Sequence, residues 1–286
     1  MKKAWVFGGI ALILIGLGGI ASYGFSTEQN LEPVEKTWSF KADSLQRLQI
    51  KSDYSVSITF VRSTDGNNSI HLTGEGTEKM VEDTLVTEIQ NGELALDLRE
   101  KPKRWFSFFN INTHSAKENL TIALADGVRF DALDLKLDSG NVTIKDAELA
   151  AIDSAKIDID SGNVTLDRFK SGQLEVDVDS GNVTANGLTA AVKVSSDSGN
   201  IRLNDVSGPA DLKVDSGNIR LYKLTNDEAN IKADSGNVYV QVPSDFAGFY
   251  DLKVDSGSIS APESKRLTTD YVKVRSDSGN IKIEQK

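Results

Sequence analysis

The chain has 286 residues, a formal net charge of −10 at pH 7 and no cysteine. The lack of cysteine excludes disulfides, thiolate metal sites, a cysteine nucleophile and a lipid anchor on cysteine. The acidic balance argues against nucleic acid as a partner, because phosphate binding requires concentrated Lys and Arg.

The first segment predicts a transmembrane anchor at residues 1–25. Lys2 and Lys3 are followed by 22 residues without charge, Ala4 to Phe25, and about 20 apolar residues are enough to span a bilayer. The two lysines place the N-terminus in the cytoplasm. We therefore expect a single-pass protein of the cell membrane whose C-terminal domain lies outside the cytoplasm. A cleaved signal peptide is the alternative, because Gly19 and Ala21 suit a cleavage site.

Residues 26–37 are polar and acidic and predict a short stalk. Residues 38–137 follow as an irregular β region, in which segments such as 120–124 alternate between apolar and polar residues, as strands with one buried face do. One short helix is expected at 78–88. Asp53-Tyr54-Ser55 is interpreted as a worn copy of a turn that recurs later in the chain. Because terminal coils of a repeat stack are atypical, this region is interpreted as the N-terminal cap of the repeats.

One insertion in the irregular region places cations beside aromatic residues. The functional interpretation is a membrane-interface loop, in which aromatic side chains enter the headgroup region and cations meet anionic lipid. The alternative is that the aromatic side chains cover the open apolar end of the β structure. The residues concerned are Lys103, Arg104, Trp105, Phe106, Phe108 and Phe109.

Residues 138–286 are organised by the tetrapeptide Asp-Ser-Gly-Asn, which occurs eight times with Ser258 replacing the last Asn once. The copies start 18–22 residues apart, at Asp138, Asp160, Asp179, Asp197, Asp215, Asp234, Asp255 and Asp277. Apolar and polar residues alternate on both sides of each copy, as in Leu135-Lys136-Leu137 and Val142-Thr143-Ile144. Such a unit of two strands cannot bury its own apolar face, so the units must stack. The sequence predicts an all-β fold, a right-handed β-solenoid or β-helix of 18–22-residue coils.

The tetrapeptide is interpreted as the turn of each coil. Gly adopts the positive φ of a sharp turn without steric cost, and stacked Asn side chains can form an amide ladder. A series of isolated hairpins is the competing interpretation, although the motif is not the usual Asn-Gly hairpin signal.

Stacking at about 4.8 Å would place the eight Asp residues in one column of like charge. The structural interpretation is that each carboxylate accepts backbone N–H bonds in its own turn and stays hydrated. The other interpretation is a calcium column, because Ca²⁺ takes six to eight oxygen ligands. The repeat lacks the glycine-rich nonapeptide of calcium-binding β-rolls. We therefore expect no metal site and keep calcium as a secondary hypothesis.

The outward strand positions become basic along the repeats. Thr143, Thr165 and Thr184 give way to Arg202, Arg220, Tyr239 and Lys282, and Asp158 and Asp177 give way to Lys213, Lys232, Lys253 and Arg275. One hypothesis is a basic face that meets anionic envelope polymers or lipid. The alternative is a solvated face whose cations screen the Asp column. The residues of the predicted basic face are Lys213, Arg220, Lys232 and Lys253.

No motif in the sequence predicts catalysis. The two histidines, His71 and His114, lie in unrelated contexts, so the sequence offers few candidates for the histidine of a Ser-His-Asp triad. No phosphate-binding loop, dinucleotide fingerprint or H-E-x-x-H motif occurs. We therefore predict a protein that is not an enzyme, with no catalytic residues and no cofactor.

The layout resembles the putative adhesin family of bacterial envelope proteins. The resemblance rests on the N-terminal apolar segment, the irregular β segment that ends at 120–124, and the serial Asp-Ser-Gly-Asn units, and it covers residues 38–286. Within that family the chain is similar to the membrane-anchored LiaG-type proteins of Gram-positive cell-envelope stress operons. The resemblance implies the fold and an envelope location, with roles in adhesion or the envelope-stress response. It supplies no catalytic residues.

Together these features predict a membrane-anchored extracytoplasmic scaffold for binding, adhesion or envelope stress. The expected partners are the membrane, through the N-terminal helix, and an envelope polymer, anionic lipid or another envelope protein. A purely structural spacer is the main alternative. A polysaccharide-acting hydrolase on a β-helix is the second alternative, but coils of 18–22 residues leave little room for the loops of an active-site groove.

Overall fold

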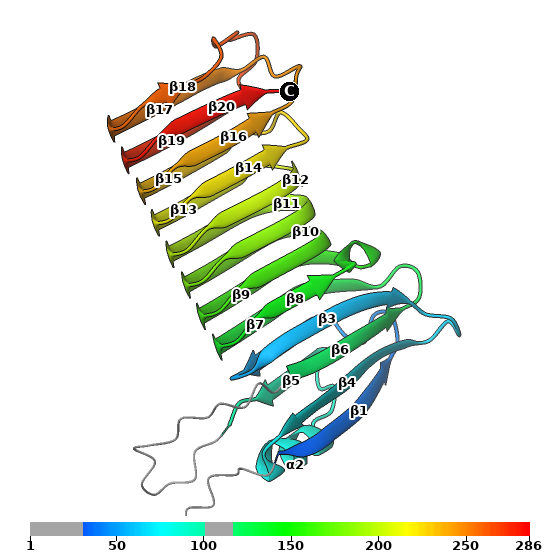
Figure 1. Cartoon of the computed structure of the whole chain (residues 1–286). Coiled ribbons are helices and arrows are strands. Elements are labelled where there is room, and N and C mark those ends of the chain that lie inside the picture. The colour runs from blue at the N-terminus through cyan, green and yellow to red at the C-terminus, as the bar shows by residue number, and fades with distance from the viewer. Residues whose placement is uncertain (1–30, 101–116) are drawn as a thin grey trace, which may run out of the picture. The chain divides into compact units, whose positions relative to one another are not determined.

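The computed structural model describes residues 31–100 and 117–286 (Figure 1). Apolar and polar residues alternate over most of this part of the chain, and most of it forms strands. In the N-terminal part the elements are β1 (Glu32–Phe40), β2 (Arg47–Ser52), β3 (Ser55–Arg62), β4 (Asn68–Gly76), α2 (Glu78–Val86), β5 (Glu93–Leu98) and β6 (Lys117–Leu124).

The repeats form the remaining strands and one 3₁₀ turn. These are β7 (Arg129–Ser139), β8 (Val142–Lys145), η1 (Ala147–Leu149), β9 (Ala151–Ser161), β10 (Val164–Ser180), β11 (Val183–Ser198), β12 (Ile201–Ser207), β13 (Ala210–Ser216), β14 (Ile219–Lys223), β15 (Ala229–Ser235), β16 (Val238–Val242), β17 (Phe249–Ser256), β18 (Ile259–Ser260), β19 (Tyr271–Ser278) and β20 (Ile281–Gln285).

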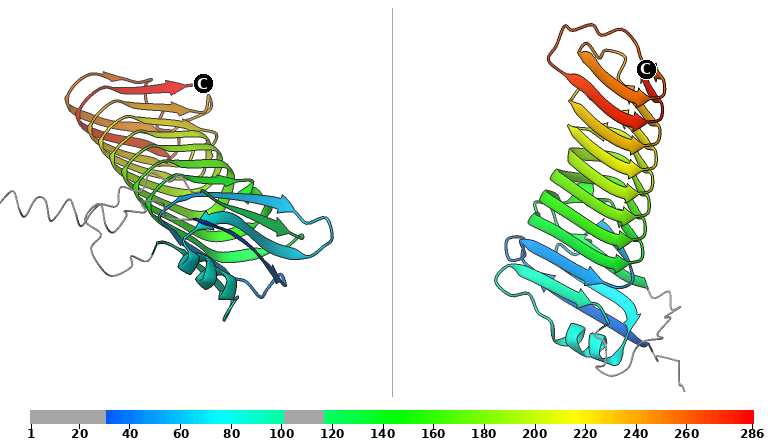
Figure 2. Two further views of the ribbon diagram at one scale, coloured as in Figure 1. Left: turned by 60° about the horizontal axis from the view of Figure 1, so that its bottom comes forward. Right: turned by 90° about the vertical axis from the view of Figure 1, so that its left-hand side faces the viewer.

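The strands build two parallel stacks (Figures 1 and 2). The turn-entering stack holds the strands before each turn, in the order β5–β2–β7–β9–β10–β11–β13–β15–β19–β17. The turn-leaving stack holds those after it, in the order β6–β3–β8–β10–β11–β12–β14–β16–β20–β18. Strands β10 and β11 are long enough to contribute to both. Inward apolar side chains of both stacks form one core, which confirms the solenoid and excludes isolated hairpins.

The Asp-Ser-Gly-Asn turns lie in contact with one another along one edge. Gly217 has φ +147°, and a Cβ placed on it would lie 1.7 Å from the carbonyl oxygen of Gly199 in the preceding turn. The Gly199 N–H donates to the Ser216 carbonyl at 3.0 Å. Glycine is therefore required at this position for two reasons: its positive φ and the close approach of the neighbouring turn.

The asparagines form the predicted amide ladder. Both the backbone N–H and the side-chain Nδ2 of Asn218 donate to Oδ1 of Asn200, at 3.1 and 3.0 Å. The same pair of hydrogen bonds joins Asn163 to Asn141 and Asn280 to Asn237. Each asparagine thus holds the next turn in register.

The coils do not stack in sequence order at the C-terminal end. The last coil, β19–β20, lies between β15–β16 and β17–β18. Asn280 therefore follows Asn237 in the ladder, and Ser258 comes last, donating its N–H and its hydroxyl to Asn280 Oδ1 at 3.1 and 2.7 Å. The sequential stacking implied by the repeat order is wrong here. The one copy that lacks Asn is the copy at the end of the described stack, where no further turn needs an amide acceptor.

The N-terminal part first continues the two parallel stacks and then ends in antiparallel strands. Strands β2 and β3 stack on β7 and β8, and Asn141 N–H donates to Ser55 Oγ at 3.0 Å, which confirms Asp53-Tyr54-Ser55 as a worn turn. Strand β4 then pairs antiparallel with both β6 and β1. Helix α2 confirms the expected helix, with Thr77 as its N-cap.

The boundary of the predicted stalk is wrong. Residues 32–37 belong to β1, which is paired with β4 over its whole length. Val34 and Trp38 are buried, and Trp38 Nε1 donates to the Thr87 carbonyl at 2.8 Å, so apolar burial extends this strand into the acidic segment.

The predicted anchor at 1–25, residues 26–30 of the stalk and the whole cation–aromatic insertion lie outside the described residues. Among the helices that are described, none is long and apolar enough to cross a membrane.

The turn contact makes a stability prediction. Gly217→Ala should lower the free energy of unfolding by at least about 3 kcal/mol, because its Cβ must displace the backbone of the neighbouring turn as well as strain φ. Gly127→Ala is the matched control, since Gly127 has φ +85° but open space around its Cβ position, and it should lose only about 1–2 kcal/mol. Urea unfolding of both variants measures the difference, and equal losses would contradict the turn contact.

Candidate functional site

The pairing registers place the outward residues of the turn-leaving stack in one row. Thr143, Thr165 and Thr184 lie beside one another on β8, β10 and β11. The row continues through Arg202, Arg220, Tyr239 and Lys282 on β12, β14, β16 and β20. The expected change from neutral to basic residues is therefore a continuous feature of one sheet face.

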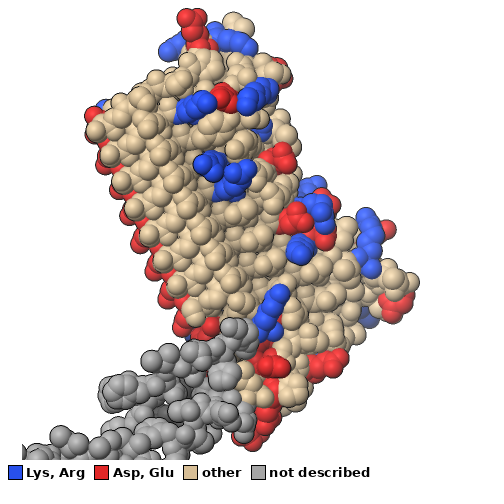
Figure 3. Space-filling model, in the orientation of Figure 1, with Lys and Arg blue, Asp and Glu red and all other residues tan. Residues whose placement is uncertain are grey.

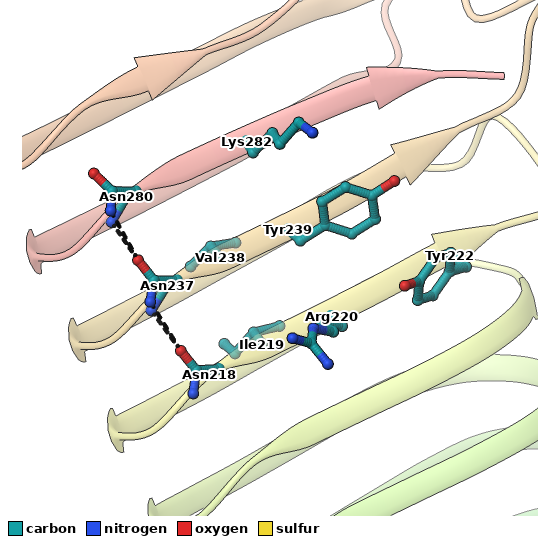
Figure 4. Close-up of a pocket in the computed structure, with 9 residues that line it drawn as sticks. All are labelled: Asn218, Ile219, Arg220, Tyr222, Asn237, Val238, Tyr239, Asn280 and Lys282. Carbon is teal, nitrogen blue, oxygen red and sulfur yellow. Dashed lines mark hydrogen bonds between the residues drawn. The ribbon is translucent and has the colours of Figure 1, made fainter.

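A groove of about 640 Å³ lies at the basic end of this row (Figure 4), within the size range of ligand sites. Buried Ile219 and Val238 lie at its base. Around them are the ladder residues Asn218, Asn237 and Asn280 and the side chains of Arg220, Tyr222, Tyr239 and Lys282. Strands β14, β16 and β20 and the turns directly before them supply all of these residues, so the inserted last coil completes the groove.

The two tyrosines are packed against each other and against cations. Their ring centroids lie 5.4 Å apart, at 50°. The Arg202 guanidinium lies 5.3 Å from the Tyr222 ring centre, and Lys282 Nζ lies 5.9 Å from that of Tyr239. Such contacts hold both rings and cations in place on the sheet surface.

Tyr239 also donates its hydroxyl to Glu284 Oε2 at 2.7 Å. Burial, followed by this hydrogen bond, raises the pKa of Tyr239 to about 12. Lys282 lies 2.7 Å from the other oxygen of Glu284. The phenol is therefore neutral at physiological pH, and Glu284 is shared between Lys282 and Lys286.

Arg202 and Arg220 have no carboxylate partner among the described residues. They are exposed and directly opposite each other on neighbouring strands. By contrast, Arg168 pairs with Asp146 and Arg275 with Asp251. Figure 3 shows this face as mostly uncharged with small groups of Lys and Arg on it.

The structure divides the predicted basic face. Lys213, Lys232 and Lys253 lie on β13, β15 and β17 of the turn-entering stack, whereas Arg220 lies on β14 of the turn-leaving stack. Each lysine contacts the Asp two residues later, with N–O distances of 2.8, 2.8 and 2.9 Å to Asp215, Asp234 and Asp255. The screening interpretation fits these lysines. A single face of all four residues is wrong, because strands on the two sides of a turn present opposite outer faces.

The Asp column follows the spatial order of the coils along the turn edge, visible as the line of acidic atoms in Figure 3. Asp277 therefore lies between Asp234 and Asp255. Within the described residues, no column carboxylate accepts a backbone hydrogen bond of its own turn, so the expected Asx-turns are absent there. No group of three or more His, Asp or Glu among these residues is arranged to hold a metal ion.

One His-centred cluster occurs on the N-terminal sheet. His71 Nδ1 lies 2.8 Å from Thr37 Oγ1, and Nε2 lies 3.6 Å from Glu35. Thr37 and His71 are directly opposite each other on β1 and β4, and the Glu35 side chain is 74% exposed. Catalytic electrostatics require a site that excludes water, so this cluster is an exposed cross-strand contact.

Two buried ionisable side chains among the described residues, Lys223 and Glu118, were not predicted from the sequence. Lys223 takes the inward position opposite Val206 at the end of β14, and the apolar residue after it, Leu224, is 58% exposed. Burial lowers the pKa of Lys223 to about 8, and its amine donates to the Gly208 carbonyl at 2.7 Å. It takes the inward position that Val206 holds in the neighbouring coil, and its amine satisfies the backbone carbonyl of Gly208 in the bend between β12 and β13.

Glu118 is fully buried on β6, and neither carboxyl oxygen has a hydrogen-bond partner among the described residues. It occupies the space that Gly74 leaves, since a Cβ there would lie 1.8 Å from Glu118 Oε2. Burial, and then the charge of Glu75, raise the pKa of Glu118 to about 8. An ionisable residue on an inward strand position was the only sequence signal for it.

A protein-family model described as Toastrack DUF4097 matches residues 45–284. Among solved structures, a putative adhesin from Bacteroides fragilis has a TM-score of 0.53 at 14% sequence identity, covering 88% of this chain and 97% of that chain. A putative adhesin from Parabacteroides distasonis has a TM-score of 0.35 at 14% identity, covering 90% and 98%. No curated protein matches the sequence.

Glu118 predicts a pH-dependent stability. Its pKa is higher in the folded state, about 8, than in the unfolded chain, about 4.5, so the folded state holds a proton that the unfolded state loses between these values. The contribution of Glu118 to the free energy of unfolding should be greatest below pH 4.5 and should decrease by a few kcal/mol as the pH rises to 8. Glu118→Gln should therefore stabilise the protein at pH 8 but not at pH 4.5, in urea unfolding.

Glu175→Gln is the control, because Lys193 lowers the pKa of Glu175 and its pH dependence has the opposite sign. A Glu118→Gln effect that did not change with pH would contradict the buried neutral carboxyl.

Because the Asp column is interpreted as structural, we expect the thermal stability of the protein not to depend on calcium. The melting temperature should be the same with a chelator and with millimolar calcium, because three of the eight carboxylates are already paired with lysines. A heat of binding in a calcium titration together with a higher melting temperature would establish the calcium column instead.

Proposed function

Because the chain belongs to the Toastrack DUF4097 family, whose model matches most of its length, we propose that it is a non-enzymatic scaffold that binds a component of the cell envelope. The B. fragilis structure that shares its fold is described as a putative adhesin, which supports a role in adhesion. The observation that carries the proposal is the groove lined by Arg220, beside which Arg202 lies on the neighbouring strand. Neither arginine has a carboxylate partner among the described residues.

The proposal includes a location. Residues 1–25 anchor the chain in the cell membrane, and the β-solenoid faces outward, as the charge-free segment after Lys2 and Lys3 supports. This layout is the one by which the chain resembles LiaG-type proteins of Gram-positive envelope-stress operons. The binding scaffold would then act at the envelope when that stress response operates.

A purely structural spacer is the alternative that the regular stack favours. The two roles differ in how they depend on coil number. Deleting residues 179–196, one 18-residue coil, joins Val178 to Asp197 and keeps the motif and the strand order. A spacer becomes shorter by about 4.8 Å, whereas the groove on β14, β16 and β20 stays intact.

The test is cosedimentation of the purified protein with isolated cell envelopes. The intact chain and the 179–196 deletion should bind with the same affinity, and binding should weaken as salt rises because exposed charges are screened. Absence of saturable binding by the intact chain would overturn the scaffold. Loss of a cellular phenotype in the deletion with full envelope binding would favour the spacer.

A further inference from the structure

Arg202 and Arg220 are held side by side without a counter-charge. They are register partners on β12 and β14, and neighbouring strands lie about 4.8 Å apart. Like charges at directly opposite positions of neighbouring strands repel each other even in water. The lysines of the turn-entering stack avoid such repulsion by contacting Asp215, Asp234 and Asp255. An anion that contacts both guanidinium groups would remove the repulsion on the turn-leaving face.

The tyrosines give the same site flat faces. Tyr222 lies between Arg202, which stacks on its ring, and Tyr239, at 5.4 Å between ring centroids. Both rings are partly exposed. A tyrosine ring offers an apolar face and a polar hydroxyl together, which suits a ligand with apolar C–H faces and hydroxyl groups, such as a sugar ring.

The asparagine ladder adds hydrogen-bond donors on the rim. Asn237 Nδ2 donates one hydrogen to Asn218 Oδ1, and Asn280 Nδ2 does the same to Asn237 Oδ1. A side-chain amide carries two N–H donors. One donor on each ladder residue is therefore left for a ligand, repeated at the spacing of the coils.

We propose that this groove binds a polysaccharide that carries phosphate or carboxylate groups. The inference rests on the proposed envelope-binding function and names the ligand class of the same site. Arg202 and Arg220 contact the anionic groups, since the planar guanidinium matches phosphate and carboxylate geometry. Tyr222 and Tyr239 contact the sugar rings, and the ladder amides donate to hydroxyl groups.

The groove does not suit a lipid surface. Insertion into a bilayer interface requires exposed apolar side chains, and the apolar residues of the groove, Ile219 and Val238, are buried at 0% and 1% exposure. The exposed large apolar residues of the described chain lie elsewhere, at Leu85, Val86, Leu224, Ile259 and Leu267. A polymer lying along the sheet fits the surface better than a membrane does.

Binding of the full chain to four probes tests the proposal: a phosphomannan, polygalacturonate, neutral dextran, and phosphatidylglycerol vesicles. The intact chain should bind at least one of the two anionic polymers, with an affinity that falls as salt rises, and should not bind dextran. Vesicle binding through the proposed anchor at residues 1–25 should be the same for the intact chain and for a variant without the two arginines. Arg202→Gln with Arg220→Gln should weaken polymer binding at least about tenfold, because each charged hydrogen bond contributes about 1.5–3 kcal/mol.

Lys213→Gln with Lys232→Gln is the matched control. It removes the same charge from the opposite stack, where both lysines contact Asp, and should change the affinity less than about twofold. Circular dichroism should show both double variants folded, since all four side chains are exposed.

Equal losses in the two double variants would overturn the groove in favour of general charge attraction. Vesicle binding that is lost in the Arg202/Arg220 double variant, without polymer binding by the intact chain, would replace the polysaccharide with lipid. Binding to neither anionic polymer would reject the ligand class. The envelope assay separates this inference from the proposed function. If envelopes bind the Arg202/Arg220 double variant as well as the intact chain, the scaffold stands and the groove is wrong.

Discussion

The structure depends on the contact between the backbones of successive turns. At Gly162, Gly181, Gly199, Gly217 and Gly236, the position of a Cβ lies 1.6–1.7 Å from the carbonyl oxygen of the glycine in the adjacent turn. No side chain fits in that space. The asparagine ladder then fixes each turn in register with the next. A one-residue slip would break the ladder and turn the inward side chains outward, so this edge aligns the outward rows on both stacks.

Aligned rows explain why the two outer faces carry such different electrostatics. On the turn-entering stack Lys213, Lys232 and Lys253 each contact the motif Asp two positions later. Their positive charge is neutralised within one coil. On the turn-leaving stack Arg202 and Arg220 lie beyond the turn, where the strand offers no nearby carboxylate. The same solenoid therefore presents one self-balanced face and one face with cations available to a ligand.

Local features of the fold could be predicted because they repeat. Strand alternation, the glycine turn, the amide ladder and the worn turn at Asp53-Tyr54-Ser55 all follow from short-range rules. The order of the last coils could not be predicted, because the chain from 261 to 270 is long enough to return past one coil and sequence spacing does not reveal it. Ser258 was the available signal, since an end turn needs no Asn.

The groove could not be predicted without that coil order, because the order brings Lys282 beside Tyr239. The predicted basic face combined Arg220 with lysines of the other stack and left out Arg202, because counting charges ignores the side of the turn on which a residue lies.

Disulfide trapping tests the coil order, and with it the way the groove is assembled, most directly. The chain has no cysteine, so any disulfide within a double-cysteine variant must join the two introduced residues. Ser235 and Ser278 are register partners, as are Ser278 and Ser256, and strands about 4.8 Å apart are within the Cα range of a disulfide. The account predicts that Ser235→Cys with Ser278→Cys forms a disulfide under mild oxidation and that Ser235→Cys with Ser256→Cys does not. Efficient bonding of the second pair and none of the first would contradict it, because the coils would then stack in sequence order and Lys282 would lie away from Tyr239.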